Sequence, residues 1–545
     1  MRSIRKSFLV APPTGARIRT RLRPTADDED VLRAVGDHLG RLASADLAMR
    51  CRLGRGTTQR TARKRALTAQ STSRWAGSIT RTSNDQWERA LANLADHRIG
   101  LRRATDIIAS RVAVPIGSRH GRVRGYASAT ERTAKQRRLQ HLNAEMVGVE
   151  KRLTVASVSV CRGGVRLAKQ RHSLDKAGIP EEHWRDCWHA ARWFLTADGD
   201  ARYPLGNGMI QVHPEQNWLE LRLPAPLEHL ANRPRGRYRL ANPVFFSHRR
   251  DEWAAQVTSG AVRYDISLDT AKRRWYLDAS WRINSVQAPS LEELRQQRLL
   301  GVDLNADHLA CWPLDNSGNP IGQPHTIPLQ LYGLSGSTRD GRLRSAVANL
   351  VRLASSSGCQ SIVIENLNFT EVRQIGRETL GRGRRGKRFR SIIAGIPTRR
   401  FGALVAGMAT NKGLWVIAVD PGWTSRWGRR YWQTPLNQTT NSSVTVTGHH
   451  AAAAVIARRG LGLGARRRPG MTGHDRRIVA GELPARPDHQ RPGGEEPGPP
   501  AGQRAAVEPC KTRVGERTWP GDQAVQDRSG PPGGHPPPDR QGTVG

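Results

Sequence analysis

Two segments, LLGVDLNADHLACWPLDNSGNPIG at Leu299–Gly322 and SIVIENLNF at Ser361–Phe369, decide the fold of this 545-residue chain. Each contains a short apolar run typical of a buried strand, and each run ends in an acid, Asp303 in the first and Glu365 in the second. An acid in that place is costly unless it meets a cation or a hydrogen-bond donor. Two such acids on neighbouring strands would form an oxygen-ligand site for a hard metal ion.

Two further segments follow in the same half of the chain. They are GLWVIAVDPGWTSRWG (Gly413–Gly428), in which Asp420 follows an apolar run, and HHAAAAVIARRGLG (His449–Gly462), which is rich in alanine. Together the segments resemble, in order, the RuvC motifs of TnpB proteins and type V CRISPR effectors. The stretch between motifs, residues 388–413, matches that family's amphipathic helix and its Lys-Gly exit. The resemblance covers about residues 301–468 and implies an α/β RuvC-like (RNase H-type) domain at 299–468.

The resemblance also implies partners. They are a guide RNA and a double-stranded DNA target, with base pairing choosing the sequence while the protein reads a short adjacent motif. The basic run at 371–400 suits a channel for the RNA–DNA heteroduplex, and its other interpretation is a solvated loop. The nucleic-acid-binding candidates in this run are Arg382, Arg384, Arg385, Lys387, Arg388 and Arg390.

The third acid of the family's site is missing from its expected place. The resemblance makes Asp303, Glu365 and His450 the catalytic positions, because His450 stands where the family has Asp. Asp420 is the one nearby acid, so the expected metal ligands are Asp303, Glu365 and Asp420, holding Mg²⁺ or Mn²⁺. Imidazole is a poor magnesium ligand and lacks a fixed negative charge. We therefore expect weak or absent cleavage, unless His450 only caps the helix and Asp420 rescues catalysis.

The zinc ribbon of the family is also not evident. The corresponding segment, residues 424–443, has Trp427, Tyr431 and Trp432 but no cysteine. The six cysteines of the chain are scattered and form no CxxC pair, so no zinc is expected. The three aromatic residues either pack the loop in place of the metal or stack on unpaired bases.

The first 200 residues predict a mainly helical recognition region after a short β segment at Ala16–Leu22. The clearest helix runs from Ser128, which has capping-box spacing with Glu131, to Leu153. Its basic residues either lie along a nucleic-acid backbone or form an ordinary solvated face. The nucleic-acid-binding candidates on this helix are Lys135, Arg137 and Arg138.

Between residues 201 and 298 the periodicity changes to two, which is typical of strands. Trp218–Leu223, Val262–Asp269 and Arg274–Trp281 alternate between polar and apolar residues and predict a small antiparallel, wedge-like β domain. The Pro- and Gly-rich stretch at 469–545 predicts a disordered tail. The expected fold class is therefore multidomain α+β: a helical region, a small antiparallel β domain, a RuvC-like α/β domain and a disordered tail.

The charge supports a polyanionic partner. The chain has 87 Lys and Arg against 47 Asp and Glu, a formal net charge of +40, which favours salt-dependent binding to nucleic acid. The plainer alternative is a basic disordered tail on an unrelated fold. No apolar run is long enough to span a membrane, so we expect no membrane partner and a cytoplasmic location.

Three functions are consistent with these features. The leading hypothesis is an RNA-guided DNA-binding protein with a degenerate nuclease site. The second is an active RNA-guided endonuclease associated with an insertion sequence, that is, a transposase accessory protein. The third is a guide-independent DNA-binding protein or nuclease on the same fold.

Overall fold

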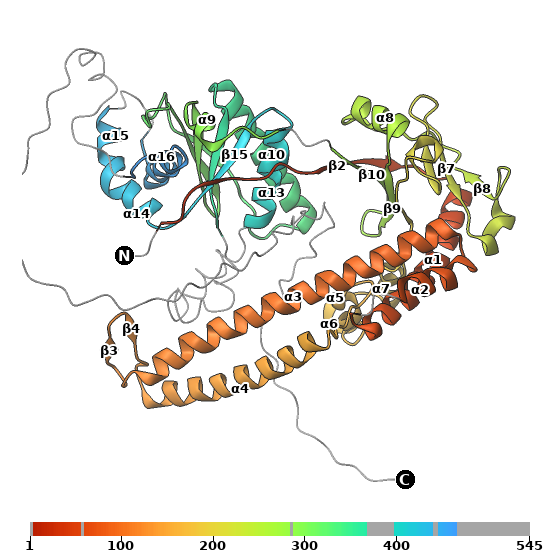
Figure 1. Cartoon of the computed structure of the whole chain (residues 1–545), viewed down its shortest axis with the longest axis horizontal. Coiled ribbons are helices and arrows are strands. Elements are labelled where there is room, and N and C mark those ends of the chain that lie inside the picture. The colour runs from red at the N-terminus through yellow and green to blue at the C-terminus, as the bar shows by residue number, and fades with distance from the viewer. Residues whose placement is uncertain (1–3, 56–58, 284–286, 368–396, 440–444, 466–545) are drawn as a thin grey trace, which may run out of the picture. The chain divides into compact units, whose positions relative to one another are not determined.

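The computed structural model describes residues 4–55, 59–283, 287–367, 397–439 and 445–465 (Figure 1). They divide into two compact units. The first unit consists of the described parts of Met1–Pro12, Pro289–Asn366 and Arg400–Gly545, and the second of those of Pro13–Ala288 and Leu367–Arg399. The three strand-end acids predicted from the sequence all belong to the first unit.

The first unit is built on a six-stranded mixed sheet with the order β1-β15-β14-β11-β12-β13. Its strands are β1 (Phe8–Leu9), β11 (Leu299–Leu304), β12 (His308–Leu314), β13 (His325–Pro328), β14 (Ser361–Glu365) and β15 (Trp415–Val419). β11, β14 and β15 are parallel neighbours, whereas β12 runs antiparallel to β11 and to β13. β1 pairs antiparallel with β15 and brings the start of the chain into this sheet, which the sequence did not indicate.

Helices cover both faces of this sheet (Figure 1). Val302 and Ile364 pack with the residues of α10 and α13 on one face, and Val363 and Ile417 pack with those of α16 on the other. Because both faces are buried, the strands read as continuous apolar runs. The helices of this unit are α9 (Leu291–Arg295), α10 (Gly336–Ser356), α13 (Thr398–Thr410), α14 (Thr424–Gly428), a π-helical turn (Arg429–Gln433), α15 (Thr434–Thr439) and α16 (Gly448–Gly460).

α16 lies very close to the sheet because small residues line the contact. All seven residues from Ala451 to Ala457 are buried. A methyl group added at Gly301 of β11 would collide with the backbone carbonyl of Ala453. The Ala-rich composition thus serves helix–sheet packing, and it places the first turn of α16 beside the end of β11.

The second unit contains the long helices predicted in the first 200 residues. α4 confirms the expected helix: the hydroxyl of Ser128 accepts a hydrogen bond from the Glu131 amide at 3.2 Å, and Leu142 and Val149 are buried against α3. The helices are α1 (Ala26–Leu53), α2 (Gln59–Thr68), α3 (Ser73–Ala113), α4 (Ala129–Thr154), α5 (Val165–Gln170), α6 (Leu174–Ala177), α7 (Glu181–Ala190) and α8 (Arg250–Ser259), with 3₁₀ turns at Pro204–Gly206 and Ala225–Leu230.

The strands of the second unit form two larger antiparallel sheets and a short hairpin. The first sheet has the order β2-β10-β9-β5 and the second β6-β7-β8. The strands are β2 (Gly15–Leu22), β3 (Arg119–His120), β4 (Val123–Arg124), β5 (Thr196–Ala197), β6 (Ile210–Val212), β7 (Leu219–Arg222), β8 (Arg237–Arg239), β9 (Arg263–Asp269) and β10 (Arg274–Arg282). β7, β9 and β10 coincide with the three segments whose period of two predicted strands.

These sheets do not form a core of their own. Ile18 of β2, Leu32 of α1, Trp75 of α3 and Leu277 of β10 belong to a single hydrophobic cluster. The boundary expected at residue 200 therefore crosses one core, because β2 pairs along its whole length with β10. A pairing between segments so far apart in the chain leaves no local sequence pattern.

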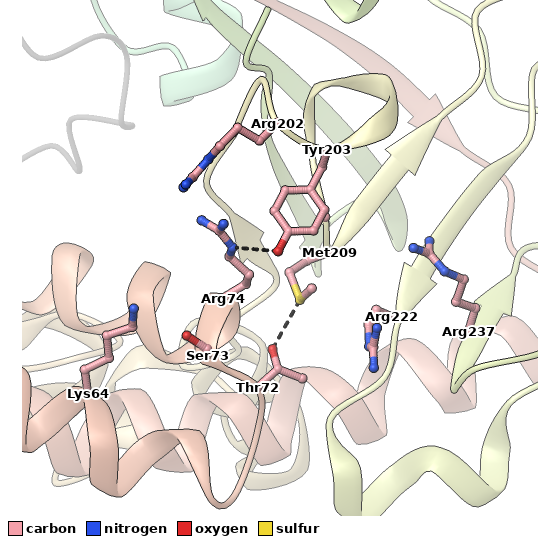
Figure 2. A pocket seen from close by; sticks show the side chains of 10 residues that line it. Lys64, Thr72, Ser73, Arg74, Arg202, Tyr203, Met209, Arg222 and Arg237 are labelled. Atoms are coloured by element: carbon pink, nitrogen blue, oxygen red, sulfur yellow. Dashed lines mark hydrogen bonds between the residues drawn. The ribbon is translucent and has the colours of Figure 1, made fainter.

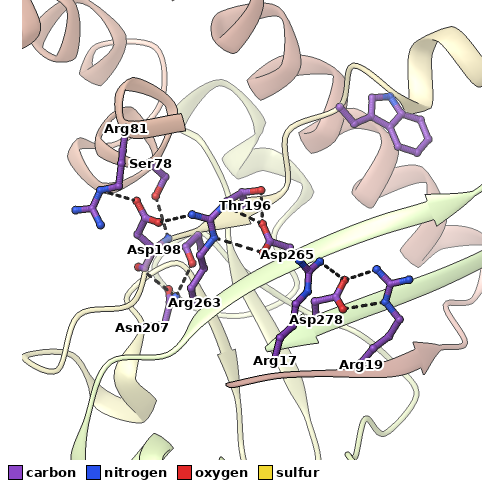
Figure 3. Close-up of polar contacts among 12 residues, drawn as sticks. Arg17, Arg19, Ser78, Arg81, Thr196, Asp198, Asn207, Arg263, Asp265 and Asp278 are labelled. Carbon is purple, nitrogen blue, oxygen red and sulfur yellow. Dashed lines mark hydrogen bonds and ion pairs between the residues drawn. The ribbon is translucent and has the colours of Figure 1, made fainter. Parts of the chain in front are cut away.

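Buried acids in the first of these sheets are neutralised by arginines (Figure 3). Asp278 of β10 is 2% exposed and accepts two hydrogen bonds of 2.8 Å from Arg19. Arg17 adds an ion pair at 3.0 Å. Asp265 lies opposite Asp278 on β9 and accepts a hydrogen bond of 2.6 Å from the hydroxyl of Thr196. The cross-strand repulsion between the two acids is thereby offset.

The expected fold class is confirmed at the level of a multidomain chain with many helices and a mixed sheet. The predicted tail at 469–545 and the basic residues from Arg382 to Arg390 lie outside the described residues. Among the described helices, none is long and apolar enough to cross a membrane.

Candidate functional site

Three carboxylates lie at one edge of the first unit's sheet. Val302 pairs with Ile364 and Glu365 pairs with Val419, so Asp303 and Glu365 occupy the same level on adjacent parallel strands. Asp420 follows directly after β15, the next strand. The carboxyl ends of parallel strands meet at one edge, which is why three acids far apart in sequence come together. Asp303 is 4% exposed and Asp420 is 6% exposed.

Glu365 is the acid whose ionisation the site opposes most clearly. Burial raises its pKa to about 8, and the nearby charges of Asp303 and Asp420 add to the rise. The Thr424 hydroxyl donates a hydrogen bond of 2.5 Å to Glu365 Oε1, which offsets part of that rise. Glu365 is therefore largely protonated at neutral pH in the absence of a bound cation.

Asp420 is held by backbone donors. Its carboxylate accepts hydrogen bonds from the amide of Gly422 at 2.7 Å and from the amide of Arg5 at 3.2 Å. The guanidinium of Arg459 on α16 donates to the carbonyl oxygens of Asp420 and Gly422, at 2.5 Å each. Arg459 is buried, and burial lowers its pKa below its usual value. Arg459 therefore anchors to α16 the loop in which Asp420 lies.

Asp303 contacts a histidine that the sequence analysis did not select. His449 Nδ1 lies 2.9 Å from Asp303 Oδ2, and the side-chain amide of Asn305 donates to the same oxygen at 3.1 Å. The hydrogen bond with Asp303 raises the pKa of His449 above its usual value. The ring of His308 meets that of His449 edge to face, with centroids 5.1 Å apart.

His450, the residue selected from the sequence, caps its own helix. Thr447 is the N-cap of α16, and His450 accepts a hydrogen bond from the Thr447 amide at 3.3 Å through Nδ1. Its Nε2 lies 2.8 Å from the hydroxyl of Thr326 on β13. Burial lowers the pKa of His450 to about 4, and the neighbouring histidines act in the same direction. His450 is thus neutral near pH 7, with Nδ1 engaged in the helix cap and Nε2 bonded to β13.

Trp427, Tyr431 and Trp432 pack the loop that follows Asp420. Trp432 is buried and its indole donates to the carbonyl oxygen of Ala465 at 2.9 Å. Trp427 and Tyr431 are partly buried against the same apolar cluster, which includes the sheet-facing side of α16. Arg459 lies over the ring of Trp427, 5.1 Å from its centroid. Packing, one of the two uses expected from the sequence, accounts for these contacts.

The donor atoms of the carboxylate edge fit Mg²⁺ or Mn²⁺ by chemistry, because both ions prefer oxygen ligands. The repulsion that raises the pKa of Glu365 is also of the kind that a divalent cation removes. In the described part of the chain, however, no three His, Cys, Asp or Glu side chains are arranged as a metal site. The ligand roles of Asp303, Glu365 and Asp420 therefore remain predictions.

The basic residues predicted on α4 lie in the second unit. Arg137 and Arg138 are exposed, and Lys135 is half-buried with its ammonium 5.9 Å from the centre of the Tyr126 ring. Their role in nucleic-acid binding remains a prediction.

Among solved structures, the chain is similar to RuvC of T. thermophilus in complex with a Holliday junction substrate. The match has 16% sequence identity and a TM-score of 0.20, and it covers 30% of this chain and 90% of that one. No family model and no curated protein matches the chain. The resemblance to TnpB proteins accordingly stays a hypothesis.

Proposed function

We propose that the chain is an RNA-guided DNA-binding protein whose carboxylate edge is a divalent-metal nuclease site of weak or no activity. The observation that carries the proposal is the meeting of Asp303, Glu365 and Asp420 at the ends of three adjacent strands, two of them almost fully buried. A structural sheet gains nothing from such a group of like charges, whereas a metal site requires it.

The neighbouring helix supports the proposal of weak activity. The first turn of α16 offers histidines where a fourth carboxylate would strengthen metal binding. His449, rather than His450, is the one that reaches Asp303. A raised pKa makes His449 more cationic, and a cation in contact with Asp303 competes with a metal ion.

Each residue has a role in this proposal. Asp303, Glu365 and Asp420 hold the ion, and Arg459 fixes the loop of Asp420. A bound Mg²⁺ or Mn²⁺ would activate water and stabilise the leaving oxygen. Guide RNA and target DNA neutralise the +40 charge of the chain. Proposed contributors are Lys135, Arg137 and Arg138, and the run Arg382, Arg384, Arg385, Lys387, Arg388 and Arg390.

The test begins with purification from cells that carry the native flanking DNA, followed by sequencing of the bound RNA. The reconstituted complex is assayed for binding and cutting of a matched duplex in magnesium and in manganese. We expect guide-dependent binding, with cutting that is slow and stronger in manganese. His449→Asp should raise cutting at least about tenfold, as one added carboxylate ligand improves metal binding.

His450→Asp is the matched control. It adds the same charge one residue away and preserves the helix cap, because Asp28 fills the same capping-box position in α1. Fast cutting in magnesium by the wild type, abolished by Asp303→Ala, would favour the active endonuclease instead. Tight DNA binding without any co-purified RNA would favour the guide-independent alternative.

A further inference from the structure

A basic cavity of about 420 Å³ opens in the second unit, at the beginning of α3 (Figure 2). Residues from α2, the first turn of α3, the loop 202–209 and strands β7 and β8 line it. Its cationic side chains are Lys64, Arg74, Arg202, Arg222 and Arg237. In Figure 2, Lys64 and Arg74 reach the cavity from the helices, whereas Arg222 and Arg237 stand on the strand side.

The frame of the cavity is preformed. The indole of Trp75 in α3 donates to the carbonyl oxygen of Arg222 at 3.0 Å and ties β7 to the helix. The hydroxyl of Thr72, the N-cap of α3, contacts Met209 Sδ at 3.3 Å and ties the loop to the same turn. Trp75 and Met209 are both buried. The cationic side chains thus extend from elements that are fixed to one another.

The acids around the cavity neutralise only part of this charge. Asp200 pairs with Arg74 at 2.5 Å and with Arg202 at 3.0 Å. Glu220 pairs with Arg237 at 3.0 Å, but it is shared with Arg239. Within the described residues, Lys64 and Arg222 have no ion pair. Two carboxylates therefore face five cations.

Two further features favour an anion in this place. The side chain of Arg222 lines the cavity, and within the described residues its guanidinium has no ion pair, which leaves a charged donor without a charged partner. The first turn of α3 has no acid and carries Arg74, although the beginning of a helix already bears partial positive charge. A tetrahedral anion inside the cavity would satisfy both, since donors surround it from several directions.

We propose that this cavity seats one phosphate group of a single nucleic-acid strand. Ser73, Arg202 and Tyr203 at the rim are exposed, which leaves room for the neighbouring nucleotides outside. Lys64 and Arg222 contact the phosphate oxygens. The inference rests on the proposed nucleic-acid binding and names a site for it in the second unit.

The test compares Lys64→Gln with Arg65→Gln in the full chain freed of nucleic acid. Both changes remove one charge from α2, but Arg65 does not line the cavity. Binding of a fluorescent single-stranded oligonucleotide is measured across a salt series. We expect Lys64→Gln to weaken binding roughly three- to tenfold and to reduce the slope of log affinity against log salt by about 0.7, the contribution of one phosphate contact. Arg65→Gln should change affinity less than about twofold.

Arg222→Gln provides an independent variant, with thermal unfolding as the check that it folds. Equal effects of Lys64→Gln and Arg65→Gln, or no effect of either Lys64→Gln or Arg222→Gln, would overturn the proposal.

In a second arm, inorganic phosphate replaces chloride at matched ionic strength during thermal unfolding. Stabilisation of the wild type by phosphate without oligonucleotide binding would show a small-molecule phosphate site and overturn the nucleic-acid assignment. A wild type that binds neither probe overturns this site. If the wild type and all three variants bind the oligonucleotide with equal affinity, the proposed phosphate site is wrong, but the proposed function is not contradicted.

Discussion

Asp278, buried in a sheet of the second unit, and Glu365, partly buried at the end of a strand of the first, have pKa values that move in opposite directions. Burial opposes ionisation of Asp278, but the hydrogen bonds from Arg19 and Arg17 outweigh it and lower the pKa below its usual value. Burial of Glu365 is reinforced by Asp303 and Asp420, and its pKa rises to about 8. The difference lies in the partners: two arginines in one case, two further acids in the other.

Asp278 therefore adds to the stability of the fold, whereas ionisation of Glu365 lowers it. An acid with matched cations contributes to stability, whereas a cluster of like charges reduces it. A protein that keeps such a cluster almost fully buried carries a cost that folding alone does not explain. A bound divalent cation would offset this cost, and for that reason the proposed metal site lies at the edge of β11, β14 and β15.

The largest loss of stability is expected for Asp278→Asn. The change leaves Arg17 and Arg19 without their shared carboxylate, which should destabilise the second unit by roughly 3 kcal/mol at pH 7. A lowered pKa means that the stability is present above the unfolded value of 3.8 and is lost as the pH falls through the folded pKa. Hydrogen exchange of peptides from β2 and β10 measures the effect, and the gap to the wild type should narrow below pH 3.8.

Asp269→Asn in the neighbouring strand is the control, because this acid is partly exposed and its ion pair with Lys272 is a surface one of 3.8 Å. It should cost less than about 1 kcal/mol. Equal losses for Asp278→Asn and Asp269→Asn would mean that the arginine pairs add nothing to stability.

Glu365→Gln should act in the opposite direction and stabilise the metal-free protein. The folded pKa of about 8 lies above the unfolded value of 4.5, so the wild type loses stability as the pH rises between these values. The variant has no such loss. Its unfolding temperature should match that of the wild type near pH 5 and exceed it at pH 9. The corresponding gain in the free energy of unfolding at pH 9 is roughly 2–4 kcal/mol. The glutamine oxygen can still accept the bond from Thr424.

A constant difference between Glu365→Gln and wild type across this pH range would contradict the raised pKa of Glu365 and thus its burial beside two other acids. The same two proteins also test the proposed metal site. Added Mg²⁺ should stabilise the wild type more than the variant, because only the ionised Glu365 gains from the cation.

The sequence predicted the acids of this site but not the histidine beside them. Asp303 and Glu365 each end an apolar run, and the ends of parallel strands meet whatever the details of packing. The side of α16 that faces Asp303 depends instead on where the helix begins. An error of one residue rotates a helix by about 100°, which is the difference between His449 and His450. The capping-box spacing between Thr447 and His450 was the signal that could have fixed the first turn.

In the fold, too, the locally patterned elements were predicted and the long-range contacts were not. Periodic segments such as α4 and β10 were predicted because their patterns are local. The pairings of β2 with β10 and of β1 with β15 join segments more than 250 residues apart, and loop closure over such distances leaves no mark in either segment. Arg19 and Asp278 were thus not recognisable as partners, although each stands in a strand-like segment.

The smallest effect is expected for the pair of Asp303 with His449, whose half-exposed ring has a raised pKa because of its hydrogen bond with Asp303. The raised pKa of His449 means that the pair stabilises the protein below pH 6.5, and that this contribution is lost as the pH rises through the folded value. His449→Gln should therefore cost about 0.5–1 kcal/mol near pH 5.5 and nothing near pH 9. Thermal unfolding across this range measures the difference.

His450→Gln is the matched control because its shift has the opposite sign. A folded pKa of about 4 makes the wild type lose stability as the pH falls below 6.5, so the cost of removing this helix cap should be largest near pH 8 and shrink on acidification. Opposite pH trends from two adjacent histidines would distinguish the one that faces the acids from the one that caps the helix. Parallel trends would contradict either the Asp303 contact of His449 or the burial of His450, according to their shared direction.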